Sequence, residues 1–369
     1  MDHQRVTRRA FLARTTAAGA GLAAAIGFGL RGASAQQEPE KRNMQTSMTY
    51  RMLGDTNLLV SCLSFGCIQL QDDRLAVLDL AVERGVNTVH VNRGYNGGQA
   101  IASLGKFLKD KRDKVWVMLK SNSPNIDADL ETLQTDHVDI LCVHDLNPEQ
   151  LRDPAIADKF QKLVDAGKTR FLNLTSHSDP QQCMESAVDC GMYTSVLATI
   201  NPSNLDAFRP TLSKAMDRKV GTFTMKCMQN AGGEGPAQVT RAMLAAGVTS
   251  VLKTLSSNEE AEAFLGAVAE EVEIARAGAV TVASAAGCTL CGACTRSCPQ
   301  NVAIQDLLRN YEYYCVQQGK PAIGREQFAQ LPAVRTAAHC GDCGTCERVC
   351  PQRLPVRRLI READRVLLA

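Results

Sequence analysis

Between residues 58 and 273 the chain alternates short apolar runs rich in β-branched residues with amphipathic stretches of helical period. This alternation is typical of a parallel α/β fold, whose strands are buried on both faces. Eight pairs can be counted, with predicted strands at 60–66, 87–91, 114–120, 138–144, 169–176, 195–200, 221–227 and 250–255. The helices are expected to begin near Arg74, Gln99, Asn125, Pro148, Pro180, Arg209, Gly235 and Asn258. Eight repeats, with no Gly-x-Gly-x-x-Gly after the first strand, favour a (β/α)8 TIM barrel over an open doubly wound sheet.

Downstream of the barrel the pattern becomes mainly helical. Helical stretches are predicted at 303–318, 324–331 and 354–368, on either side of cysteine-rich loops. We therefore expect a barrel over residues 48–276 and a second, mainly helical ferredoxin-like domain over residues 277–369.

The cysteine-rich loops contain two runs of the form C-x2-C-x2-C-x3-C-P, at residues 288–299 and 340–351. This is the ligand spacing of bacterial ferredoxins, in which the fourth cysteine of each run binds the other cluster. Two 4Fe-4S clusters are therefore predicted. The first would be bound by Cys288, Cys291, Cys294 and Cys350, and the second by Cys340, Cys343, Cys346 and Cys298. Paired C-x2-C motifs also bind zinc, but the third cysteine, the fourth and the proline favour iron and sulfur.

The first 35 residues differ from the rest, because Arg8-Arg9 precedes an apolar stretch over residues 17–30 and then Ala33-Ser34-Ala35. This is the pattern of an export signal, and residues 7–12 resemble the twin-arginine signal of proteins exported already folded. We expect a periplasmic protein delivered by the twin-arginine (Tat) export machinery, with residues 36–47 as a linker. Fourteen weakly apolar residues span a bilayer poorly, so membrane attachment is expected only through an uncleaved signal.

Composition and charge narrow the classes of partner. The formal charge is +2 and 22% of residues are charged, without a basic stripe, which argues against nucleic-acid binding. A small-molecule substrate and a protein electron-transfer partner are expected instead. Fifteen cysteines in an exported chain would suggest disulfides. Export after folding, however, allows clusters to be inserted in the reducing cytoplasm.

Polar and titratable residues occupy the carboxyl ends of several predicted strands, where TIM barrels carry their active sites. These residues are His90, Lys120, His144, Thr175, Ser176 and Lys226, with Tyr95 just beyond the second strand. A single histidine there would be read as structural. Three strand ends that carry His, Lys and His favour an active site.

These residues lead to a family resemblance. Residues 50–61, 65–66 and 167–170, together with Tyr95, Lys120 and His144, resemble the aldo-keto reductases, in the branch with a C-terminal ferredoxin-like extension. The resemblance implies that Tyr95 donates a proton to a substrate carbonyl oxygen, that Lys120 assists it, and that His144 orients the carbonyl.

The sequence departs from this family at the positions that hold the cofactor. His90 stands where the family has the aspartate that pairs with the lysine. Thr175-Ser176 replaces a serine-asparagine pair, Ile200 replaces a tyrosine that stacks under nicotinamide, and residues 253–256 lack a phosphate-loop glycine. These departures argue against NADPH binding, with Thr175, Ser176 and Lys226 as the remaining candidate contacts. The sequence does not decide whether a flavin binds.

Two functions remain open. The first is an exported iron-sulfur oxidoreductase for carbonyl or alcohol chemistry, with Tyr95 as general acid/base and electrons passing through the clusters. The second is a catalytically degenerate barrel that serves as an electron-transfer protein or as the redox subunit of a partner enzyme. The retained Tyr95, Lys120 and His144 favour the first, and the altered His90 position favours the second.

Overall fold

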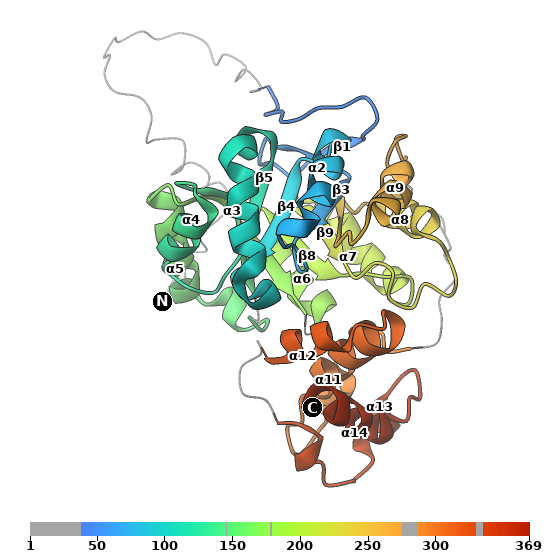
Figure 1. Cartoon of the computed structure of the whole chain (residues 1–369). Coiled ribbons are helices and arrows are strands. Elements are labelled where there is room, and N and C mark those ends of the chain that lie inside the picture. Colours follow the sequence, from blue (N-terminus) through green and yellow to red (C-terminus); the bar gives the residue numbers. More distant parts are fainter. Residues whose placement is uncertain (1–37, 145, 178, 275–286, 330–334) are drawn as a thin grey trace.

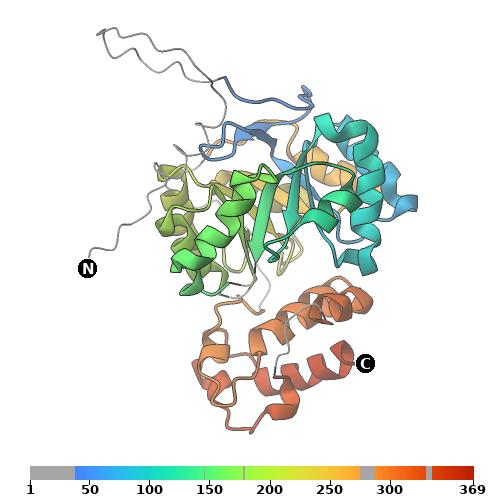
Figure 2. The ribbon, with the colours of Figure 1, turned by 90° about the vertical axis from the view of Figure 1, so that its left-hand side faces the viewer.

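The computed structural model describes residues 38–144, 146–177, 179–274, 287–329 and 335–369. A barrel forms one body and a smaller helical domain lies beneath it in Figure 1, and the side view in Figure 2 shows the same two layers. Residues 1–35, the expected export signal, lie outside the described residues. None of the helices in the described ranges combines the length and the apolar character needed to cross a membrane.

Eight parallel strands close the barrel in the order β10-β3-β4-β5-β6-β7-β8-β9. They are β3 (Leu63–Gly66), β4 (Thr88–Asn92), β5 (Trp116–Lys120), β6 (Val138–His144), β7 (Thr169–Ser176), β8 (Ser195–Thr199), β9 (Gly221–Met225) and β10 (Ser250–Lys253). An antiparallel hairpin of β1 (Tyr50–Met52) and β2 (Leu59–Ser61) precedes them. Leu53, Leu58 and Val60 of this hairpin region pack with side chains of the barrel interior such as Phe223. The predicted TIM barrel is therefore confirmed.

A ring of helices covers the barrel. They are α2 (Leu75–Glu83), α3 (Gln99–Lys111), α4 (Asp127–Leu133), α5 (Pro154–Asp165), α6 (Pro180–Cys190), α7 (Leu205–Asp217), α8 (Pro236–Ala245) and α9 (Asn258–Ala267). The start expected near Pro148 is wrong, because Asp153 caps α5 by accepting a hydrogen bond from the Ala155 amide, with Pro154 as the first helical residue. The start expected near Arg209 is also wrong, because Pro210 lies inside α7 and does not begin it.

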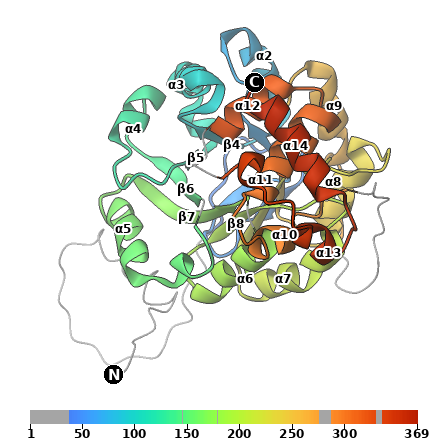
Figure 3. The same cartoon turned by 90° about the horizontal axis from the view of Figure 1, so that it is seen from below.

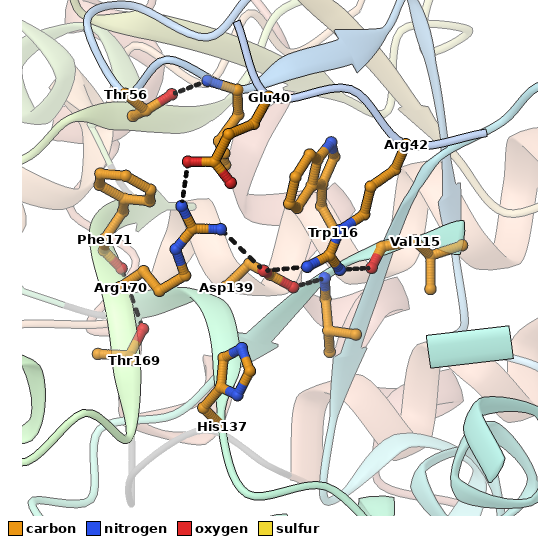
Figure 4. Close-up of polar contacts among 12 residues, drawn as sticks. Glu40, Arg42, Thr56, Val115, Trp116, His137, Asp139, Thr169, Arg170 and Phe171 are labelled. Carbon is orange, nitrogen blue, oxygen red and sulfur yellow. Dashed lines mark hydrogen bonds and ion pairs between the residues drawn. The ribbon is translucent and has the colours of Figure 1, made fainter. Parts of the chain in front are cut away.

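The amino-terminal end of the barrel is held by charges around Asp139, a fully buried residue of β6 (Figure 4). Its Oδ2 atom lies 2.9 Å from Nη2 of Arg112, while Oδ1 lies 3.5 Å from Nη2 of Arg42 and from Nη1 of Arg170. Glu40 pairs with Arg170 at 2.5 Å. Charged residues at this face of a TIM barrel serve stability, because the active site lies at the other end.

The described part of the expected linker at residues 36–47 contacts the barrel. Glu40 forms a bridge with Leu58, and Arg42 reaches the buried carboxylate of Asp139. Two residues of this polar segment, Glu40 and Arg42, thus attach it to the barrel.

The second domain is mainly helical, as predicted. Its elements are α10 (Ala293–Arg296), α11 (Ile304–Leu308), η6 (Arg309–Gln317), α12 (Pro321–Ala329), η7 (Ala337–His339), α13 (Thr345–Val349) and α14 (Val356–Leu367). The stretch expected as one helix over 303–318 is an α-helical turn and a half, α11, that continues as the π-helix η6. Leu307, Val356, Ile360 and Ala363 belong to a separate core that also contains cluster cysteines. Seen from below, α11, α12 and α14 lie across the carboxyl ends of the barrel strands (Figure 3).

Candidate active site and cluster sites

The first predicted cysteine set surrounds one cavity. Cys288, Cys291 and Cys294 of the first run line it together with Cys350 of the second run. The rest of the lining is largely apolar and includes Leu308, Leu354 and Val356. The chain thus brings together three neighbouring cysteines and a fourth from 56 residues beyond Cys294, in the crossed order that the spacing predicts.

The second predicted set surrounds a second cavity, lined by Cys298, Cys340, Cys343 and Cys346. The two loops are built alike, because Gly292 precedes α10 with φ 71° and Gly344 precedes α13 with φ 69°. A side chain is rarely accommodated in this left-handed conformation, which explains a glycine at the same place in each run.

The thiols are suited to a metal centre that supplies positive charge. Burial raises the pKa of Cys294 to about 11 and raises the pKa of Cys288 further. Such thiols stay protonated at neutral pH unless a bound metal stabilises the thiolate. In the described ranges, no three His, Cys, Asp or Glu side chains are grouped as ligands of a single metal ion. The cysteines surround cavities instead.

The first cysteine set lies against the barrel and the second faces away from it. Asn230, after β9, donates a hydrogen bond from Nδ2 to the Cys288 carbonyl oxygen at 3.3 Å. Arg296 of α10 forms an ion pair with Asp179, just before α6. The cavity of the second set is lined by residues of the helical domain alone, and Cys343 is exposed there.

At the carboxyl end of the barrel, the structure brings together the four residues expected to be catalytic. His90 of β4 is buried, and its ring centroid lies 6.0 Å from that of Tyr95. Burial, followed by electrostatic interactions with Lys120 and His144, lowers the pKa of His90 to about 3. His90 is therefore a neutral group where an aspartate would carry a negative charge.

A fifth residue, His177, was missed by the sequence analysis. Its Nε2 lies 3.1 Å from Nζ of Lys120, so this lysine contacts a second histidine in place of a carboxylate. Burial, followed by the charge of Lys120 and of other nearby cations, lowers the pKa of His177 well below its ordinary value. The only sequence signal was its place one residue beyond the strand end at Thr175-Ser176.

A cavity of about 70 Å³ lies between the barrel and the helical domain. The barrel contributes Gly66, Ile68, Gln69, His90, Tyr95, His177, Met225, Lys226, Leu252, Lys253 and Thr254, and the helical domain contributes Tyr313, Tyr314, Gln318, Lys320, Ile323 and Gln327. Of the three expected cofactor contacts, Lys226 belongs to this lining. Thr175 and Ser176 are buried in β7 and are not among the lining residues that the structure describes.

Two tyrosines of η6 close the barrel opening. Tyr313 and Tyr314 are each 7% exposed, and their rings pack edge to face with centroids 4.9 Å apart. Nζ of Lys226 lies 5.5 Å from both ring centroids. Because sites for drug-sized ligands and cofactors measure about 300–1,000 Å³, the residues present do not fit a nicotinamide dinucleotide with the helical domain in this position.

Comparisons with known proteins agree with this architecture. Residues 63–198 match the model of the aldo/keto reductase family, and residues 287–354 match that of the 4Fe-4S dicluster domain. A curated relative, the L-galactose dehydrogenase of Arabidopsis thaliana, is 30% identical over 44% of this chain, and the match spans 55% of that protein, about half of its length.

Solved structures share the barrel fold. An aldo-keto reductase of Bacillus halodurans aligns with a TM-score of 0.51 and 20% identity, over 62% of this chain and 93% of that one. A Pseudomonas aeruginosa protein assigned to the aldo-keto reductases aligns with a TM-score of 0.53 and 20% identity, over 60% of this chain and 94% of that one. The chain thus combines an aldo-keto reductase-like oxidoreductase barrel with a 4Fe-4S ferredoxin-type domain.

Proposed function

We propose that the protein is an iron-sulfur oxidoreductase that interconverts a carbonyl and an alcohol in the cavity between its two domains. The observation that carries the proposal is that each set of four cysteines surrounds its own cavity, and that the first of these lies against the barrel opening. Thiols spread around a cavity suit a four-iron cubane better than a zinc ion, which needs four sulfurs about 2.3 Å from one point.

The π-helix η6 connects the first cysteine set with the reaction cavity. Oε2 of Glu312 accepts a hydrogen bond from the Cys288 amide at 3.4 Å, and the next two residues, Tyr313 and Tyr314, line the cavity. A short stretch of one helix therefore contacts both sites. This supports electron transfer through the first cluster to the cavity, with the second cluster facing a partner.

Carbonyl reduction consumes two electrons and two protons, and two bound clusters would supply the electrons one each. Tyr95 is the proposed proton donor to the substrate oxygen, with the second proton taken from solvent. Lys120 lies close enough to His90 to affect its ionisation, and the buried His90 ring neighbours Tyr95. A positive charge in this enclosed site stabilises the negative charge that develops on oxygen.

Export remains part of the proposal. Residues 1–35 resemble a twin-arginine signal, which would deliver the folded protein, with its clusters in place, to the periplasm. The exposed Cys343 supports contact between the second cluster and a protein electron partner.

The first test is metal content and ligand assignment in anaerobically purified protein. Two cubanes require about eight irons per chain, with matching sulfide and low-temperature EPR signals. Cys350→Ser should disturb the cluster of the Cys288 set, and Cys298→Ser the cluster of the Cys340 set. Cys315→Ser, outside both runs, is the matched control. Stoichiometric zinc without iron would overturn the proposal.

The second test separates this enzyme from an electron carrier with an inactive barrel. The small cavity and the histidine at position 90 favour the carrier. With a reduced viologen dye as electron donor, Tyr95→Phe should lower carbonyl reduction by roughly 100-fold or more, since general acids contribute about 10²–10⁴-fold. Dye oxidation by the clusters should stay unchanged. The carrier would be supported if the wild-type protein and Tyr95→Phe reduce the carbonyl equally. It would also be supported if neither protein reduces the carbonyl while both still transfer electrons to a partner.

A further inference from the structure

We infer that the loop of the second cysteine set, residues 340–351, docks onto an acidic surface of a protein electron partner, with Arg348 as its central contact. The inference rests on the proposed function in one respect, since that function gives the second cluster a protein partner. It adds the charge of this partner and the residues that contact it. The first cysteine loop, which contacts the barrel of this same chain, provides the pattern for such a contact.

The first loop contacts the barrel through an arginine and a carboxylate. Arg296, two residues before Cys298, donates a hydrogen bond from Nη2 to the Cys291 carbonyl oxygen at 3.0 Å. Its Nη1 forms an ion pair with Asp179, which directly precedes α6 of the barrel. A Cβ atom at Gly292 would collide with this carboxylate, so a glycine is needed there for the close approach. The arginine and the glycine together therefore accept a carboxylate from another element.

The second loop repeats this arginine and this glycine. Arg348, two residues before Cys350, donates a hydrogen bond from Nη1 to the Cys343 carbonyl oxygen at 3.0 Å. Its Nη2 donates to the Thr345 hydroxyl at 2.8 Å, and no carboxylate of the described residues forms an ion pair with it. A Cβ atom at Gly344 would lie 3.4 Å from Nη1 of Arg348, without a collision. The same two residues thus face outward, where the carboxylate of another protein can reach them.

The chain around the second loop is strongly basic. Residues 335–361 contain six arginines, no lysine and two acidic residues, Asp342 and Glu347. Both acidic residues already pair with arginines of α14, Glu347 with Arg357 at 2.8 Å and Asp342 with Arg361. Six positive charges against two negative ones leave +4 over this stretch. An acidic surface is the complementary partner, and its attraction would speed the encounter.

These arginines are accessible at the edge of the second cysteine set. Four of them are exposed, namely Arg335, Arg348, Arg353 and Arg358. The ligand Cys343 is exposed as well, and it is the residue whose carbonyl Arg348 contacts. Figure 1 shows α13, which carries Arg348, on the side of the helical domain away from the barrel. A protein that docks on these arginines would therefore reach the edge of the second cluster.

The arginines could instead offset the negative charge that four thiolates give to a cluster. The first cysteine set provides the comparison within the same chain. It has the same four thiolates, yet its run over residues 288–299 contains a single arginine, Arg296, which Asp179 already neutralises. The six arginines near the second set exceed what the first set uses for the same cluster charge. This difference favours a role in docking.

The test follows reduction of the full-length protein, with its clusters oxidised, by two donors in stopped-flow mixing. Flavodoxin hydroquinone is an acidic protein, and reduced methyl viologen is a small cation. At low ionic strength, Arg348→Gln and Arg358→Gln should each slow reduction by flavodoxin roughly threefold or more, because electrostatic attraction raises association rates. Added salt should shrink this difference. Reduction by the dye should not slow. Lys109→Gln, at an exposed residue of α3, is the matched control and should change neither rate.

Equal slowing with both donors would overturn the inference, because the arginines would then act on the cluster and not on a partner. Flavodoxin rates that match the wild type in both arginine variants, or a wild-type protein that only the dye reduces, would overturn it too. It would also fail if both variants lose binding to phosphatidylglycerol vesicles in sedimentation while flavodoxin reduction is unchanged, since the surface would then bind a membrane. A protein with charge-dependent flavodoxin reduction but no carbonyl reduction would retain the docking surface and lose the proposed function.

Discussion

Replacing Asp139 with asparagine should destabilise the barrel without changing the reaction site. Asp139 is fully buried, and its carboxylate accepts the Val117 amide at 2.8 Å and lies 2.9–3.5 Å from three arginines. Asparagine keeps the shape and one acceptor oxygen but leaves the arginines without their counter-charge. Breaking a buried ion pair on one side costs about 3–5 kcal/mol. Because the arginines are 20–29% exposed, water compensates in part and the expected loss is about 3 kcal/mol.

The assay is urea unfolding followed by fluorescence of Trp116, the one tryptophan of the chain. The guanidinium of Arg42 lies 3.9 Å from the Trp116 ring centroid, so the signal comes from this network. The midpoint should fall with an unchanged slope, because the surface exposed on unfolding is the same. Asp136→Asn, whose side chain is 91% exposed, is the matched control and should change stability by less than about 0.5 kcal/mol. A loss below about 1 kcal/mol in Asp139→Asn would refute the reasoning.

Three other predictions concern the cavity and the domain contact. Since the pKa of His90 is lowered to about 3, the unfolded chain binds a proton there that the folded chain does not, and this residue alone should lower stability by up to about 1.4 kcal/mol per pH unit as the pH falls from 6.5 towards 3. The pKa of His177 is lowered too and adds to this dependence. His90→Gln should therefore reduce the slope in urea titrations at different pH without abolishing it, and an unaltered slope would contradict the reasoning. Tyr314→Ala should cost about 3 kcal/mol in urea unfolding, because the ring is only 7% exposed, and a loss below about 1 kcal/mol would contradict this reasoning. Asn230→Ala removes contacts with Gln317 at 2.7 Å and with Cys288, so amide exchange in η6 should quicken while exchange in β5 stays constant.

Much of the barrel could be predicted from the sequence, because the short apolar runs of the strands and the amphipathic helices are local properties. The eight strands lie within a few residues of their expected positions. The start of α5 lies at Pro154 and not near Pro148, because the Asp153 side chain caps the helix there by accepting a hydrogen bond from the Ala155 amide. The crossed cysteine sets were also predictable, since their spacing encodes the geometry of the ligands.

The candidate site was only half predictable, for a physical reason. His90, Lys120 and His144 follow from the rule that strand ends meet, and Tyr95 from its place after β4. His177 lies one residue beyond β7, where no strand periodicity fixes its direction. Tyr313 and Lys320 belong to another domain, and the face of that domain that covers the barrel depends on tertiary contacts such as those of Asn230.

The closed opening and the cysteine clusters are best explained together. An enzyme that exchanges a dinucleotide at every turnover needs an open groove, and here Tyr313 and Tyr314 fill the opening instead. Under the proposed function, an electron source in the covering domain removes that need, because only a small substrate has to enter. The helical domain of the proposed enzyme therefore both delivers the electrons and limits the size of the substrate.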